Sequence, residues 1–171
     1  MHLLLSKFGF FLLCLGLAAS PALAVMSGEE SNTVRSGDSD YADGKEAFLA
    51  EDWPAAIEAL DKVVARRPWH DNAHNMLGFS WRKLGDYERA FVHYDKALSL
   101  NPRHRGALEY LGEAYLELGR TDEAMVILLR LAKVCDYVVM AFDNQGWKSG
   151  CEELRDLKEA FAEHGVPLPK K

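Results

Sequence analysis

The sequence lacks the short motifs on which common enzyme active sites depend. It contains no Gly-x-Ser-x-Gly turn, no His-Glu-x-x-His pair and no phosphate-binding loop that ends in lysine. Glu109, Glu113 and Glu117 are spaced as a stripe along one helix, but such a stripe is more often a solvated face than a set of catalytic acids. We therefore predict that the protein is not an enzyme and that it uses no cofactor.

Basic residues and long hydrophobic runs are also scarce. The 20 lysines and arginines are outnumbered by 26 acidic residues, which gives a formal net charge of −6. A nucleic-acid-binding domain needs a clustered basic face, so this balance argues against nucleic acid as a partner. The longest apolar run, residues 8–19, is shorter than the ~20 residues that a membrane span requires.

The apolar run has the flanks of a secretory signal peptide. Lys7 precedes it, and the small-x-small sequence Ala22-Leu23-Ala24 follows it. We predict cleavage after Ala24 and a periplasmic or secreted protein with no stable membrane span; a membrane-anchoring helix is the alternative. Residues 25–36 are polar and aperiodic, which predicts a flexible lead-in.

Cysteine is rare, and export changes how the cysteines are interpreted. Loss of the signal peptide removes Cys14 and leaves Cys135 and Cys151. In an oxidising compartment such a pair predicts a disulfide, with free thiols as the alternative. No Cys-x-x-Cys or neighbouring histidine completes a four-ligand set, so we predict no metal site. The intervening residues 136–150 have no clear helical period, which predicts a loop.

The sequence does contain an internal repeat. Small and helix-breaking residues recur at an interval of 34 residues, which is typical of stacked repeats. They are Gly44, Gly78 and Gly112; Ala56, Ala90 and Ala124; and Pro68 and Pro102. Gly78 lies in the middle of a predicted helix, where glycine costs about 1 kcal/mol relative to alanine. We therefore expect the partner helix to approach closely at this residue.

The middle copy carries most of a known pattern, His74-x2-Leu77-Gly78-x2-Trp81, Ala90-x3-Tyr94 and Pro102. It resembles the tetratricopeptide repeat, Trp-x2-Leu-Gly-x2-Tyr, Ala-x3-Phe, Pro. The resemblance implies an all-α, right-handed α-solenoid of three helical hairpins, residues 37–70, 71–104 and 105–138. Gly85-Asp86 is expected to end one helix and cap the next. Asp136 replaces the expected proline, so the last repeat helix ends differently or runs on.

Residues 139–171 are predicted to form the rest of the disulfide-tied loop, a capping helix and a tail. Leu154, Leu157, Ala160 and Phe161 lie on one face of this helix, and Gly165 follows its end. A solenoid needs such a helix to cover its last repeat. The segment Cys-Glu-Glu-x-x-Asp-Leu-Lys is similar to the ending of other small exported bacterial repeat proteins.

In the family, the first helices of successive repeats line a concave groove that holds a peptide or a partner's helix. We therefore predict a protein-binding adaptor of the bacterial envelope. The matching groove positions are Tyr41, Lys45, Phe48, Leu49, Asn75, Phe79, Arg82, Lys83, Glu109, Glu113, Leu116 and Glu117. This lining is aromatic and basic at its amino end and acidic at its carboxyl end, which favours a ligand with acidic and apolar residues first and a cation near the third repeat.

Several alternatives remain open for these residues. Arg82 and Lys83 could instead pair with Glu113 and Glu117 on the neighbouring helix, and the phenylalanines could be partly buried. The chain could also self-assemble through its end faces. The remaining aromatic and histidine side chains are not assigned to the groove. Trp53, Trp81, Tyr87 and Tyr94 are predicted core residues, and Trp69, His93, His104 and His164 are predicted to be exposed.

Overall fold

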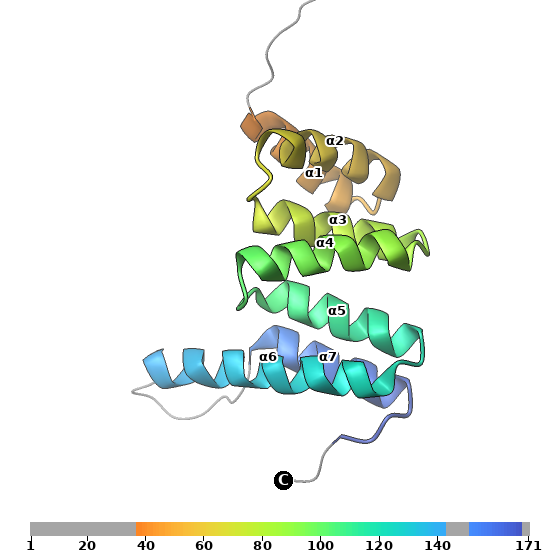
Figure 1. The fold of residues 1–171 in the computed structure, drawn as a ribbon, viewed down its shortest axis with the longest axis vertical. Helices are drawn as coiled ribbons and strands as arrows, with labels where there is room; N and C mark the ends of the chain where they lie inside the picture. The colour runs from red at the N-terminus through yellow and green to blue at the C-terminus, as the bar shows by residue number, and fades with distance from the viewer. Residues whose placement is uncertain (1–36, 143–150, 169–171) are drawn as a thin grey trace, which may run out of the picture. The chain divides into compact units, whose positions relative to one another are not determined.

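A computed structural model describes residues 37–142 and 151–168 of the chain. The predicted signal peptide and lead-in, and residues 143–150 of the predicted loop, lie outside these ranges. Within them all regular secondary structure is α-helical (Figure 1), as predicted. The helices are α1 (Gly37–Leu49), α2 (Trp53–Arg66), α3 (Asp71–Lys83), α4 (Tyr87–Leu100), α5 (Arg105–Glu117), α6 (Thr121–Phe142) and α7 (Glu152–Glu163). None of these helices combines the length and the apolar character that a membrane span requires.

The helices pair as hairpins, and the hairpins stack. α1 packs on α2, α3 on α4, and α5 on α6; α2 then contacts α3, and α4 contacts α5 (Figure 1). Each hairpin therefore covers an apolar face of the next one, which a single hairpin could not do for itself. The predicted α-solenoid of three hairpins is confirmed.

The turns within hairpins depend on glycine and aspartate at repeated positions. Gly85 ends α3 with a positive φ of 80°, which glycine adopts without strain. Asp86 then caps α4, because its Oδ1 accepts a hydrogen bond from the Arg89 amide at 3.0 Å. Asp52 caps α2 in the same way through the Ala55 amide. The Gly85-Asp86 prediction is confirmed.

The turns between hairpins use histidine instead. Nδ1 of His70 accepts from the Ala73 amide at 3.2 Å, and Nδ1 of His104 accepts from the Ala107 amide at 3.1 Å. These histidines are 34 residues apart and cap α3 and α5. The expectation that His104 is solvated was therefore wrong. It was also wrong for His93, which is partly buried and hydrogen-bonded to His74, whereas His164 is exposed.

The close helix approach predicted at Gly78 is confirmed. A Cβ on residue 78 would lie 2.6 Å from Cδ1 of Tyr94, whose side chain is fully buried. Gly44 meets Leu60 in the same way. A Cβ on residue 112 would lie 2.7 Å from Cδ1 of Leu157 on α7. The last close approach is therefore made to the capping helix.

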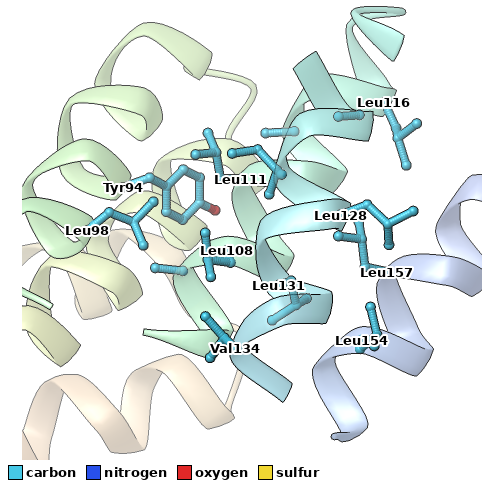
Figure 2. Close-up of a cluster of buried hydrophobic side chains, with 14 of the residues drawn as sticks. Tyr94, Leu98, Leu108, Leu111, Leu116, Leu128, Leu131, Val134, Leu154 and Leu157 are labelled. Atoms are coloured by element: carbon cyan, nitrogen blue, oxygen red, sulfur yellow. The ribbon is translucent and has the colours of Figure 1, made fainter. Parts of the chain in front are cut away.

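α7 completes the core of the carboxyl-terminal half. It contacts both α5 and α6, so it takes the place that the first helix of a fourth repeat would occupy. Leu157 and Phe161 are fully buried, and Leu154 is nearly so. Figure 2 shows Leu154 and Leu157 directed at the side chains of α6. The prediction of a capping helix is confirmed.

The end of α6 agrees with one prediction and contradicts another. The helix runs on past Asp136 to Phe142, which was one of the two outcomes expected there, whereas the loop predicted from residue 136 is wrong for residues 136–142. Asp136 retains the backbone N–H that proline would lack, and nothing there obliges the helix to stop. The structure places Cys135 beside Cys151, with their Cα atoms 5.5 Å apart, a separation that a disulfide spans.

Candidate protein-binding face

The first helices of the hairpins lie next to one another and form one face. α1 contacts α3, α3 contacts α5, and α5 contacts α7. We call the surface formed by these helices the first-helix face. All twelve predicted groove residues are on its helices, at different depths. Lys45, Leu49, Lys83 and Glu117 are exposed; Tyr41, Phe48, Phe79 and Glu113 are partly buried; Asn75, Arg82, Glu109 and Leu116 are buried.

Two of the buried residues offer little to a partner. Leu116 is part of the hydrophobic core that joins α4 to α7. Its position on α5 faces the buried side chains of α4, α6 and α7, so a partner cannot reach it. Asn75 is also buried, and its Oδ1 has no hydrogen-bond partner within the described residues. The surface that a partner can reach is therefore smaller than the predicted set.

A row of aromatic rings crosses the first-helix face. Phe79 on α3 lies between Phe48 on α1 and Tyr110 on α5, with ring centroids 5.0 and 4.6 Å apart. Trp53, at the start of α2, adds an edge contact to Phe48 at 5.7 Å. We call these four partly exposed residues the aromatic ladder. Trp53 was expected in the core and Tyr110 was not among the predicted groove residues.

The four aromatic residues predicted for the core divide into two groups. Tyr94 is fully buried, as predicted. Trp53, Trp81 and Tyr87 are only partly buried, although Trp81 and Tyr87 pack against the buried core. Trp69 follows the proline between the first two hairpins and is 67% exposed, which confirms that prediction.

Arg82 is the central charged residue of the face, and it is directed inward. It is only 5% exposed, and its Nη2 lies 2.7 Å from Oε2 of Glu113. Its Nη1 lies 3.3 Å from Oε1 of Glu117, and the guanidinium lies over the Phe79 ring at 4.9 Å. The alternative that Arg82 pairs with α5 is therefore confirmed. Lys83 remains exposed, with Nζ 5.3 Å from the Phe79 centroid.

Carboxylates gather where α5 meets α7. Glu109 is 8% exposed, and burial raises its pKa to about 8, helped by the negative charges of Glu113, Asp156 and Glu153. Burial and the Glu109 charge also raise the pKa of Tyr110 to about 12. Among the described residues no group of three or more His, Cys, Asp or Glu side chains could hold a metal ion. This region therefore concentrates negative charge without offering a metal site.

The sequence missed the contribution of α7 to this region. Glu153 and Asp156 face α5, and Nε of Arg105 lies 3.4 Å from Oε1 of Glu153. Their positions follow from α7 occupying the place of a fourth first helix. A search for acidic residues beside the apolar face of the capping helix would have found them.

The stacked hairpins and their shared first-helix face define an α-solenoid, a class whose neighbouring repeats form extended binding surfaces. Sequence models of the tetratricopeptide repeat match residues 41–98 and 82–134, which together span most of the three hairpins. The chain belongs to the tetratricopeptide repeat family. No curated protein matches it.

Solved structures share this fold. The chain is similar to the TPR2B domain in the "TPR2B-domain:pHsp70-complex of yeast Sti1", with a TM-score of 0.64 and 18% identity, covering 75% of this chain and 95% of that one. It is similar to MamA, with a TM-score of 0.58 and 25% identity, covering 61% of each chain. It also resembles the Sgt2 domain of Aspergillus fumigatus, with a TM-score of 0.60, 16% identity and coverage of 79% and 86%.

Proposed function

We propose that this chain is a non-catalytic adaptor of the bacterial envelope that holds an extended peptide or a partner's helix on its first-helix face. The aromatic ladder carries the proposal. Its rings are partly exposed and run without a break from α1 to α5, across all three hairpins. Aromatic side chains are frequent energetic anchors of protein interfaces. The yeast Sti1 domain, which is similar in fold, was solved as a complex with pHsp70.

The charges of the face suggest how a partner would lie. Because Arg82 is held by Glu113 and Glu117, two exposed lysines of the predicted groove, Lys45 and Lys83, remain available to a partner, and Lys83 lies beside the Phe79 ring of the ladder. Apolar side chains of the partner would pack on the ladder, and an acidic residue would lie near Lys83. The basic part of the partner would point toward α7.

An envelope location rests on the signal-peptide pattern and on the Cys135–Cys151 pair. Mass spectrometry of the protein from its native envelope tests both features. We expect a mature chain that begins at Val25 and a mass two hydrogens below that of the reduced form. A chain that retains residues 1–24 or carries two free thiols would contradict the exported location.

Site-specific photo-crosslinking tests the face itself. Leu49, at the end of α1, is 71% exposed, and Val92 on α4 is 63% exposed away from the first helices. A benzophenone side chain at position 49 should crosslink a partner in the envelope, and the same group at position 92 serves as the matched control. Lys83→Glu should weaken the crosslink at position 49. Equal crosslinking from both positions would show that the partner does not use the first-helix face.

A further inference from the structure

Glu109 is a largely buried residue whose carboxylate has no ion-pair partner among the described residues. The residue is more than nine-tenths buried, but its carboxylate oxygens are not among the fully buried polar atoms, and no hydrogen bond or ion pair within the described part of the chain engages them. Burying a charged group is costly unless it is paired. A cation that reached the Glu109 oxygens from outside would offset that cost when the carboxylate is charged.

The other carboxylates of this region each have an arginine. Glu113 and Glu117 share Arg82, at 2.7 and 3.3 Å. Glu153 pairs with Arg105, and Asp156 with Arg155. We call Glu109, Glu113, Glu153 and Asp156 the acidic cluster. Glu109 is the member that forms no ion pair within the described residues, although Arg82 is near enough to lower its pKa slightly.

Among the described residues, one oxygen of the acidic cluster is fully buried and unsatisfied. Oε2 of Glu153 is buried without a hydrogen-bond donor, although Oε1 of the same residue faces Arg105. Two residues from different helices thus present carboxylate oxygens that lack donors. Because the acids here do not form a metal-binding group, the missing donor is better matched by N–H groups on an organic cation.

We propose that the acidic cluster receives a lysine or arginine side chain of the partner peptide, with the Glu109 carboxylate as its main contact. The inference rests on the proposed function, since it names the partner group bound at one end of the first-helix face. Tyr110 adjoins Glu109 and ends the aromatic ladder, so a basic residue here would follow apolar residues on the ladder. Its ring could also contact the bound cation.

Binding of a cation at this place should strengthen as the pH rises. The cation prefers the charged carboxylate, and Glu109 loses its proton at a pH of about 8 in the free protein. Affinity should therefore increase from pH 6 to pH 9, at most about tenfold per pH unit. The groups that face Glu109 and are part of this balance are Arg82 on α3, Glu113 and Tyr110 on α5, and Glu153 and Asp156 on α7.

A random peptide library displayed on phage, selected on the purified protein at pH 8.5, tests the proposal. We expect the selected peptides to carry a lysine or arginine at a fixed distance from an apolar residue. Replacing that basic residue with norleucine should lower the affinity about tenfold, and Glu109→Gln should do the same for the original peptide. The two changes together should cost no more than either one. Glu88→Gln, an exposed acid on α4, is the control and should have no effect.

The outcomes separate this inference from the proposed function. Peptides that bind the first-helix face without a basic residue, or losses that add in the double replacement, would overturn the acidic cluster as a cation site while leaving the adaptor function intact. A protein that selects no peptide at all would overturn the adaptor function and the cation site with it. A pH profile that is the same for Glu109→Gln and the unchanged protein would also overturn the inference.

Discussion

The ring of Tyr94 occupies the space that Gly78 leaves on α3, with its Cδ1 2.6 Å from the place a Cβ would take. This contact brings α4 close to α3 in the middle hairpin. Tyr94 is fully buried in the same hydrophobic cluster as Leu108 and Leu111 of α5. A change in the distance between α3 and α4 should therefore also disturb the packing of α5. The stability of the stack should therefore be sensitive to a single methyl group at residue 78.

Gly78→Ala should destabilise the protein by about 1–2 kcal/mol. Alanine improves helix propensity by about 1 kcal/mol, but overpacking against the fully buried Tyr94 ring at 2.6 Å should cost about 2–3 kcal/mol, the upper part of the usual range. Urea unfolding measures the difference. Gly106→Ala on α5 is the matched control. Its Cβ would lie 3.3 Å from Nδ2 of Asn75, and the gain in helix propensity should offset this contact, so we expect no loss of stability beyond about 0.5 kcal/mol. A Gly78→Ala protein as stable as the control would contradict the close approach.

Arg82→Met should lower the free energy of unfolding by about 3 kcal/mol, because it leaves Glu113 and Glu117 without their shared cation beside Glu109. The value is at the low end for a buried pair, since both glutamates are partly exposed. Lys83→Ala, the next residue and an exposed one, should change it by about 0.5 kcal/mol or less. Comparable losses in the two variants would show that Arg82 is not a structural ion pair.

Glu109 should make the protein less stable as the pH rises. Its folded pKa, about 8, lies above the usual value of 4.5, so the folded state holds a proton that the unfolded state has lost. The bound proton stabilises the folded state fully below pH 4.5, and this stabilisation is lost by pH 8. The free energy of unfolding should fall by at most about 1.4 kcal/mol per pH unit between these values. Melting temperatures from pH 5 to pH 9 should fall less steeply in Glu109→Gln. Parallel curves for the two proteins would contradict the raised pKa.

His104 should act in the opposite direction. Nδ1 accepts from the Ala107 amide while Nε2 lies 3.1 Å from Oδ1 of Asn72, so the cap requires a neutral ring. Burial lowers the pKa of His104 below 6.5. The contribution of the neutral His104 cap to the free energy of unfolding is therefore complete above pH 6.5 and is lost as the pH falls below that value.

His104→Ala should cost about 1 kcal/mol at pH 7 through the lost cap, whereas His104→Asn should keep the cap and remove its acid sensitivity. Thermal unfolding at pH 7 and pH 5 separates the two effects. His74 and His93 also have lowered pKa values, so part of the acid sensitivity should persist in both variants. If His104→Asn loses as much stability on acidification as the unchanged protein, the titration of His104 is not responsible.

The repeat pattern predicted most of the fold, because each marker has a local physical role. Gly78 could be recognised from its cost in a helix, and Gly85-Asp86 from turn and capping chemistry. The histidine caps were missed since histidine is not a usual capping residue, although the 34-residue interval between His70 and His104 pointed to them. Asp136 in place of proline left open that the last repeat helix runs on, but its end at Phe142 was not predicted because residues 136–142 lack a clear period.

The candidate site was less predictable than the fold. Family positions assign residues to a face but do not set the depth of each side chain, so Leu116 and Arg82 are buried while Lys83 is exposed. The pairing of Arg82 with Glu113 and Glu117 depends on how far α3 and α5 are offset, which one sequence does not give. The acidic cluster required the position of α7, a helix outside the repeat pattern.

The position of α7 also bears on whether copies of this chain could join end to end. Its side away from the core carries Arg155, Lys158, Glu159 and Glu163, all exposed. Charged side chains of both signs would have to lose their water shell for a second molecule to dock there. Filament growth from this terminus is therefore disfavoured, and light scattering of the purified protein should detect single molecules.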